Sequence, residues 1–454
     1  MKEPAMNSDL LSTKRKKAFK YLWINNPNSI LVTAFMKIGA STRFVILSVL
    51  SVTIFNALSF GQAIPPTQLA KFQLSDLTTN YSSAYLNSVF DDKIPDNVQV
   101  LALGEVSHGG YEPIAFNANM IKYLIEKKGY RKVLFEWADV GMLRAMRNYL
   151  NDPKASDAAY IPAWVKNSQS VDAVSEVFPD LLNWIKQYND RNPKDRVEIM
   201  GFEIGKDQSL INRIVYKYLI PFDHKESQKW IYQLSSDISD VDKIQVLKDW
   251  FVTNEKGLKA ELNEEDFWWL KYYIRNAVDG IGYLMRDSKT LVEKTDAANL
   301  FRDSVLAENV KYLSKGGKAI VSAHNGHVIK GQVKYMGNYL NQYFKDQYYV
   351  IATDYSKQAL VDINNQDSTT KHTQRYIRKT FPQTLSAAAN RLNEKYGISE
   401  AILFYQDIID RKIGQDINAI DANGHHLYMP EYQKNVDALV IFSHIYPSGK
   451  LKSP

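Results

Sequence analysis

Seven short apolar runs, rich in Val, Ile and Phe, constrain the fold of this chain more than any other feature. They alternate with stretches of helical pattern, and a run that is apolar on both faces is typical of a buried strand in a parallel sheet. The runs are Val98–Gly104, Lys132–Phe135, Arg196–Gly201, Lys318–Ala323, Tyr348–Thr353, Ala401–Phe404 and Ala438–Phe442. The alternation predicts an α/β fold of three layers, with a mostly parallel sheet between two layers of helices.

Two helices between these runs are well marked. Apolar residues recur at spacings of three and four from Ile114 to Ile125, and Gly129 follows as the expected C-cap. A second helix is expected over Leu300–Leu313, and Gly316 and Gly317 close it before the fourth run.

Residues 207–299 interrupt the alternation. This stretch has a helical, aromatic-rich pattern, as in the run FWWLKYY at 267–273, and it predicts a helical insertion that covers one end of the sheet. Aromatic side chains dominate protein cores, so these are expected to pack as ordinary core residues. The expected organisation is a tail over 1–63, the first part of the α/β core over 64–206, the insertion over 207–299 and the second part of the core over 300–454.

The segment Phe44–Phe60 carries no charge, is preceded by basic residues and is followed by the small residues of Gly61–Ala63. This order is typical of a secretory signal. We therefore expect export to the periplasm or the cell exterior, with cleavage near Ile64. An uncleaved anchor in the inner membrane is the alternative, because the run is nearly long enough to span a bilayer. Met36 is the expected initiator, unless residues 1–35 form a cytoplasmic tail.

Charge and cysteine content exclude several classes of partner and site. Residues 1–43 hold eight Lys or Arg and two acids, which accounts for the whole net charge of +6. The rest of the chain has 48 residues of each sign, so no nucleic-acid partner is expected. The absence of cysteine excludes disulfides, thiolate nucleophiles, cysteine zinc sites and a lipoprotein anchor.

Ionisable side chains follow four of the predicted strands at the point where each strand ends. They are Glu105 and His108 after the first run, Glu136 after the second, Glu203 after the third, and His324 and His327 after the fourth. Ligands of open parallel sheets bind outside the carboxyl ends of the strands. Buried acids and histidines are costly and tend to gather at working sites, so we expect this set to form one site.

Arg302 is expected to reach the same edge of the sheet. It lies early in the helix predicted over Leu300–Leu313, and a helix antiparallel to the strands begins at their carboxyl edge. The alternative is a surface ion pair of Arg302 with Asp303 or Glu308.

The chemistry that suits this set is activation of water. A neutral imidazole accepts a proton from water near neutral pH, and a nearby carboxylate orients the ring. An arginine or a second histidine is then available to stabilise an oxyanion. The chain has no GxSxG motif, so direct attack by water is the simpler scheme. The same residues also suit a metal site of three or four ligands, although HEXXH is absent. We expect neither a metal nor a cofactor.

Five sequence blocks together resemble the erythromycin esterase family. They are GEVSHGGYEP, VLFEWA, FRDSVLAENV, SAHNGHV and DALVIFSH, and the resemblance covers most of residues 98–444. It implies hydrolysis of a lactone or other carboxylic ester, a small-molecule substrate, without a covalent intermediate. In this resemblance His108 matches the general base. Glu105, Glu136, His324 and His327 match the other polar site positions, and Glu112 and Arg302 match supporting ones.

Two positions depart from the family pattern. Asn117 stands where the family usually has a basic residue, and Glu203 stands where it usually has Asp. Together with Glu112 these residues are candidates for substrate binding. The second hypothesis is an envelope protein that keeps the fold and is either non-catalytic or metal-dependent. Side chains too far apart to share a water molecule would favour the non-catalytic form.

Overall fold

The computed structural model describes most of the chain after its N-terminal segment. The described residues are 83–139, 149–152, 154, 177–204, 208–235, 239–287, 291–331, 334–365, 372–381, 384–387, 401–405, 417–420, 426–429 and 435–448. They belong to one compact unit, Gln62–Pro454. The export signal predicted over 44–60 lies outside them. Among the helices that the structure does describe, none combines the length and apolar character needed to cross a membrane.

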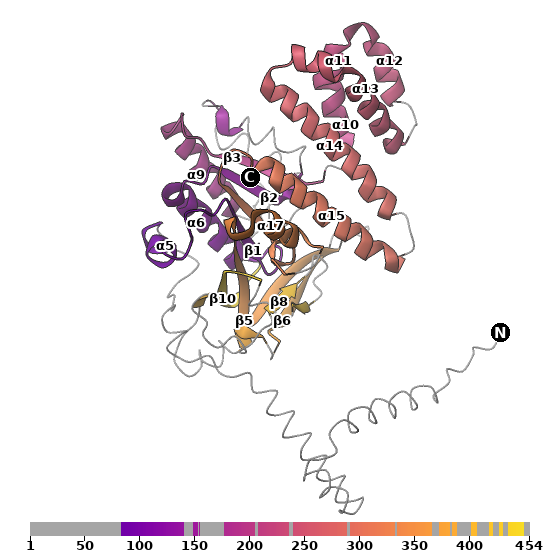
Figure 1. Cartoon of the computed structure of the whole chain (residues 1–454). Helices are drawn as coiled ribbons and strands as arrows, with labels where there is room; N and C mark the ends of the chain where they lie inside the picture. Colours follow the sequence, from indigo (N-terminus) through magenta and orange to yellow (C-terminus); the bar gives the residue numbers. More distant parts are fainter. Residues whose placement is uncertain are drawn as a thin grey trace, which may run out of the picture. The chain divides into compact units, whose positions relative to one another are not determined.

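A mixed, mostly parallel sheet forms the centre of the described structure (Figure 1), which confirms the α/β prediction. Seven of its strands follow the order β3-β2-β4-β1-β5-β10-β7, and β6 pairs with β5 outside this path. The strands are β1 Val100–Glu105, β2 Lys132–Asp139, β3 Glu198–Glu203, β4 Ala319–His324, β5 Tyr348–Asn365, β6 His372–Lys379, β7 Ala401–Phe404 and β10 Ala438–Ile445. A separate antiparallel pair consists of β8 Ile417–Ile420 and β9 His426–Met429.

Helices cover both faces of the sheet, as the strand pattern predicts. On one face the apolar side chains of β1, β2 and β3 pack with α5 Ser83–Phe90, α6 Tyr111–Lys128 and α9 Val177–Arg191. On the other face they pack with α15 Leu291–Leu313 and α17 Met336–Phe344. Alternate residues of each strand serve the two cores. In β1, for example, Leu101 and Leu103 face the α6 side, and Val100 and Ala102 face the α15 side.

The neighbouring strands β1 and β4 form the topological switch point of the sheet. The chain leaves β1 into α6 on one face, whereas it leaves β4 through α16 into α17 on the other. The short helix α16 Asn325–Val328 follows β4 directly and lies against β1. In open α/β sheets such a point opens a crevice at the carboxyl ends of the strands, where ligands bind.

The predicted helix after the first strand is confirmed. Helix α6 ends where Gly129 adopts a left-handed conformation with φ of 73°, and its N–H donates to the carbonyl of Leu124. A glycine reaches this conformation without the steric cost that a Cβ imposes.

Five strands differ from the sequence expectation. Strand β7 pairs antiparallel with β10 at the sheet edge, although its continuous apolar pattern is typical of a parallel strand. Strand β5 continues twelve residues beyond Thr353 and pairs there with β6. Neither that extension nor β6, β8 and β9 carries a long apolar run, so periodicity gives no signal for them.

Helices fill the described part of residues 207–299. They are α10 Gln208–Ile214, the π-helical turn Val215–Leu219, α11 Ile220–Phe222, the 3-10 turn His224–Glu226, α12 Ser227–Ser235, α13 Asp240–Glu261 and α14 Glu264–Asp287. A further 3-10 turn, Lys345–Gln347, follows α17. The aromatic run of α14 packs as core, as expected. Tyr272 and Tyr273 are fully buried, and Tyr272 stacks on Tyr312 of α15.

Helix α15 begins earlier than the sequence suggests. It starts at Leu291 rather than Leu300, so it crosses the domain boundary predicted at residue 299. Arg302 therefore lies near the middle of this helix and not in its first turn. Residues 291–299 have helix-forming composition, and Thr290 with Glu293 has the spacing of a capping box, a start signal that the sequence analysis did not use.

Candidate active site

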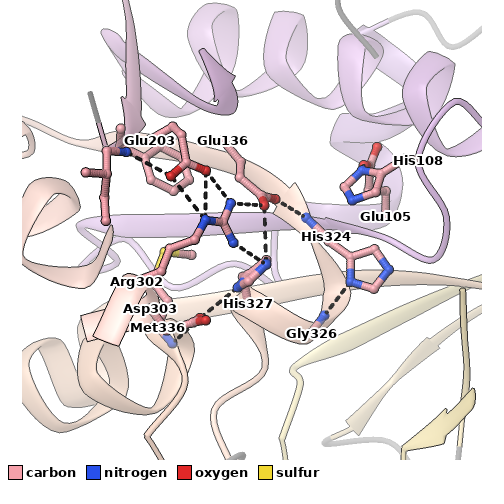
Figure 2. Close-up of polar contacts among 12 residues, drawn as sticks. Glu105, His108, Glu136, Glu203, Arg302, Asp303, His324, Gly326, His327 and Met336 are labelled. Atoms are coloured by element: carbon pink, nitrogen blue, oxygen red, sulfur yellow. Dashed lines mark hydrogen bonds and ion pairs between the residues drawn. The ribbon is translucent and has the colours of Figure 1, made fainter. Parts of the chain in front are cut away.

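The predicted site residues lie together at the carboxyl ends of four adjacent strands, β3, β2, β4 and β1 (Figure 2). Glu203 ends β3, Glu136 follows Phe135, the last residue of β2 in register with β4, and Glu105 of β1 is the register partner of His324 of β4. His108 follows β1, and His327 lies in α16. Tertiary structure thus assembles the set at the switch point between β1 and β4.

His108 is held by Glu105 three residues before it. The Nδ1 atom of His108 lies 2.7 Å from the Oε1 atom of Glu105. Glu105 is buried, and the His108 side chain keeps 26% of its exposure. With the Nδ1 proton donated to the carboxylate, Nε2 becomes the basic nitrogen of the ring.

His324 lies beside His108 in a fixed tautomer. The two ring centroids are 5.1 Å apart. The Nδ1 atom of His324 accepts the backbone N–H of Gly326 at 3.1 Å, so the neutral ring carries its proton on Nε2. The backbone N–H of His324 donates to Oε2 of Glu136 at 2.9 Å. Through this bond the His108 side of the site is tied to Glu136.

A second group of contacts, which we call the arginine cluster, consists of Arg302, Glu136, Glu203 and His327. Nε of Arg302 lies 2.9 Å from Oε2 of Glu203, and Nη2 also pairs with this carboxylate. Nη2 of Arg302 donates to Oε1 of Glu136 at 2.9 Å, and Nη1 lies 3.1 Å from Nε2 of His327. The expected alternative, a surface pair of Arg302 with Asp303 or Glu308, is wrong, because the guanidinium points into the site.

Groups of opposite charge lie in direct contact within the arginine cluster. Burial by itself would raise the pKa of Glu136. His327, Arg302 and His108, together with the His324 amide, hold the pKa well below its usual range. Burial by itself would lower the pKa of Arg302, but Glu203 and Glu136 raise it further above its ordinary value. Both groups therefore stay ionised inside the site.

Asp303 is a site residue that sequence reasoning missed. Its Oδ1 atom lies 2.7 Å from Nδ1 of His327 and accepts the backbone N–H of Met336 at 2.9 Å. The side chain is 1% exposed. Burial acts to lower the pKa of His327, but Glu136 and Asp303 outweigh it and raise the pKa. The sequence did contain a signal, because Asp303 directly follows Arg302. Adjacent residues of a helix contact different neighbours, so Asp303 meets His327 from one side while Arg302 reaches the two glutamates.

Close backbone packing brings β1 and β4 together beneath the site. The amide of Asn325 bridges to the backbone of Thr353 in β5, with Nδ2 donating to the carbonyl at 2.7 Å. Its oxygen lies directly over Gly104, where an added Cβ would come within 2.3 Å of it. Gly104 therefore has to be glycine for Asn325, which directly follows His324, to reach β5.

The structure does not place Glu112 and Asn117 among these contacts. Both lie on the buried side of α6. Glu112 accepts the backbone N–H of Tyr446, and the amide oxygen of Asn117 has no hydrogen-bond partner in the part of the chain that the structure describes. Their predicted role in substrate binding stays a prediction.

These donors do not fit a metal site. The guanidinium of Arg302 already lies among Glu136, Glu203 and His327, where a cation would have to bind. Elsewhere in the described residues, no three His, Asp or Glu side chains are grouped so that they could hold an ion.

Comparison with known proteins gives relatives of low identity. "Putative hydrolase YbfO" of Bacillus subtilis (strain 168) is 24% identical over 302 residues, which are 58% of this chain and 66% of that protein. Among solved structures, a Bacillus cereus structural-genomics target is 20% identical with a TM-score of 0.68, covering 85% of this chain and 99% of that one. A mutant of erythromycin esterase EreC in its open conformation is 14% identical with a TM-score of 0.60, covering 83% and 97%. At these identities the solved structures establish the fold.

The family comparison matches well over half of the chain. The model of the family described as erythromycin esterase matches residues 125–445. This range holds Glu136, Glu203, Arg302, His324 and His327. It begins after Glu105 and His108, which join the set through the contacts of His324. The chain therefore belongs to the erythromycin esterase family.

Proposed function

We propose that this protein is a hydrolase that cleaves a lactone or other carboxylic ester with water activated by His108. The observation that carries the proposal is the Glu105–His108 pair, 2.7 Å apart at the end of β1, beside His324 and the arginine cluster. The hydrolase name of the YbfO relative and the erythromycin esterase family support the reaction class.

The proposed reaction begins with proton transfer. Nε2 of His108 takes a proton from water while the water oxygen attacks the ester carbonyl carbon, and a tetrahedral oxyanion forms. Glu105 orients the ring and stabilises the imidazolium, as the acid of a catalytic triad does. When the intermediate collapses, the C–O bond to the alcohol breaks and His108 returns its proton to the departing alkoxide. The products are a carboxylic acid and an alcohol.

His324 is the better candidate for stabilising the oxyanion. Its Nδ1 atom accepts from Gly326, so its Nε2–H is the donor on the side of the ring away from the backbone. A single pre-positioned donor of this kind contributes on the order of 10²–10³-fold in rate. Arg302 was the other candidate, but its guanidinium is engaged by Glu203, Glu136 and His327.

The arginine cluster supports this site without taking part in the proton transfer. Glu136 links it to the reaction by accepting the backbone N–H of His324. A carboxylate that stays ionised at this position fixes the start of α16 and with it the place of the His324 ring. We assign Glu136 a positioning role on this basis.

The buried acids of the site argue for a hydrolase over a non-catalytic relative of the same fold. Burying Glu105, Glu136 and Asp303 costs free energy unless each is paired. A protein that used the fold only for shape would be more stable with apolar residues at these places.

A hydrolysis screen tests the proposal. The substrates are p-nitrophenyl acetate, p-nitrophenyl butyrate, δ-valerolactone and a 14-membered macrolide lactone, each with and without a chelator. We expect turnover of at least one of them, loss of that turnover in His108→Gln, and normal turnover in Glu308→Gln, whose side chain pairs with Lys311 on α15. No turnover of any substrate above the uncatalysed rate would reject the proposal.

Export is a separate proposal, carried by the uncharged segment Phe44–Phe60. N-terminal sequencing of protein from the native cell is expected to find a mature terminus at or near Ile64. Full-length chain in the cytoplasmic fraction would contradict it.

A further inference from the structure

We propose that Glu112 and the residues after β10 form a clamp that positions the loop bearing His108. The C-terminal clamp, as we call it, consists of Glu112 and Tyr446–Ser448. Its purpose rests on the proposed role of His108 as general base. Neither Glu112 nor Tyr446–Ser448 contacts the arginine cluster, so the clamp is a feature separate from the site described above.

Three hydrogen bonds join the two segments. The N–H of Tyr446 donates to Oε2 of Glu112 at 2.7 Å, and the carbonyl of Tyr446 accepts the N–H of Tyr111 at 2.8 Å. The N–H of Ser448 donates to the carbonyl of Gly109 at 2.8 Å. Gly110 and Pro447 form an antiparallel bridge between these bonds. The four residues that follow His108, from Gly109 to Glu112, are thus each paired with a residue of Tyr446–Ser448, which lies far away in the sequence.

The clamp also completes the start of α6. The first N–H groups of a helix have no partner within it and need an acceptor from outside. Gly110, at the N-cap position, has no side chain to supply one. The carbonyl of Tyr446 serves Tyr111 instead. The His108 loop therefore enters α6 at a point that the C-terminal segment fixes.

Packing at this point leaves no room for adjustment. A Cβ on Gly110 would come within 2.8 Å of Ile445 Cγ2, and Gly109 has a φ of 72°, which favours glycine. Glu112 is 6% exposed, and burial raises the pKa of its carboxyl. Within the part of the chain that the structure describes, Glu112 has a backbone partner and no ion pair. Burying such an acid costs free energy, which the proposed placement of His108 would explain.

The test compares two substitutions of Glu112 with a matched control. Glu112→Leu removes the acceptor, Glu112→Gln keeps an oxygen that accepts the Tyr446 N–H, and Glu126→Leu makes the same change at an exposed position of α6. A chain ending at Tyr446 weakens the clamp by a second route, because it lacks the Ser448 N–H that donates to Gly109. A chain ending at Ser448 is its control. The probes are p-nitrophenyl acetate for kcat and KM, and NMR of the labelled His108 ring, assigned with His108→Gln.

We expect Glu112→Leu and the chain ending at Tyr446 to lower kcat by about 10- to 100-fold, the effect of misplacing a catalytic group by about 1 Å. KM should change little, and Glu112→Gln should stay near wild type. The His108 ring signals should shift in the two damaged chains and not in the controls. Unchanged ring signals in both would overturn the clamp. If wild type cleaves no ester and the signals still shift, the clamp stands and the proposed function fails.

Discussion

The two halves of the site contain the same pair of groups in different surroundings. On the β1 side, Glu105 holds Nδ1 of His108, and on the α15 side Asp303 holds Nδ1 of His327, both at 2.7 Å. The difference lies at the other ring nitrogen. Nε2 of His327 lies 3.1 Å from Arg302 and 3.3 Å from Glu136, and its side chain is less exposed than that of His108.

Under the proposed function, this difference separates the histidine that takes the proton from the one that supports the site. The surroundings of a histidine decide its protonation as much as its partner carboxylate does. Burial and Arg302 act to lower the pKa of His327, but Glu136 and Asp303 raise it, so under the proposed function this ring holds the cluster together and does not take the proton from water. His108 retains the exposure that a substrate and a water molecule require.

The largest expected effect is the loss of turnover in His108→Gln. Removing a general base costs about 10²–10⁴-fold in kcat. Thermal unfolding should stay close to wild type, because His108 is the more exposed of the two rings. His327→Gln is the comparison, and we expect it to lower stability more than His108→Gln does. If His108→Gln and His327→Gln changed turnover and thermal stability equally, the distinction between the two halves of the site would be wrong.

Asp303→Ala should destabilise the fold most among the site variants. It removes one member of a buried charged pair and leaves the Met336 N–H without its acceptor. Breaking such a pair costs about 3–5 kcal/mol. Urea unfolding measures it, and Glu308→Ala on the same helix, an exposed pair with Lys311, should cost no more than about 1 kcal/mol. A wild-type midpoint for Asp303→Ala would show that His327 does not need its carboxylate.

The pH dependence of unfolding should separate the charges of the arginine cluster. The lowered pKa of Glu136 adds stability above its ordinary value of 4.5, and this is lost as the pH falls through the folded-state pKa. The raised pKa of His327 adds stability below its ordinary value of 6.5, and this is lost as the pH rises through the folded-state pKa. Both contributions are complete between these two values.

Glu136→Gln should therefore flatten the acid limb of the stability profile, and His327→Gln should flatten the limb above pH 6.5. Urea midpoints across the pH range measure both. Parallel profiles for wild type and the two variants would refute the assigned shifts.

The smallest expected effect concerns position 117. We expect weak or no wild-type hydrolysis of a 14-membered macrolide lactone, and a modest improvement in Asn117→Arg. A charged donor to an oxyanion contributes about 10²–10³-fold. Asn117 is 4% exposed, so part of that gain is offset by the cost of burying the new charge. Asn119→Arg is the control on the same helix. Efficient wild-type turnover that Asn117→Arg fails to improve would show that this charge does not select the substrate.

The sequence predicted the strand-ending residues better than the limits of the elements that carry them. All of Glu105, His108, Glu136, Glu203 and His324 meet at one edge, because buried parallel strands leave a clear apolar pattern and share the direction in which they end. The extended half of β5 and its partner β6 were not predicted, because they are mostly polar and carry no long apolar run.

What the sequence determined by itself is which residues can do chemistry and that a parallel sheet would gather them. Local pattern carries this, because strand burial and helix periodicity depend on neighbouring residues. Tertiary structure alone decided the partners of the buried charged groups: Asp303 with His327, Arg302 with two glutamates, and Glu112 with the backbone N–H of Tyr446. These contacts join residues between 24 and 334 positions apart, and their energies depend on burial and distance, which no local pattern encodes.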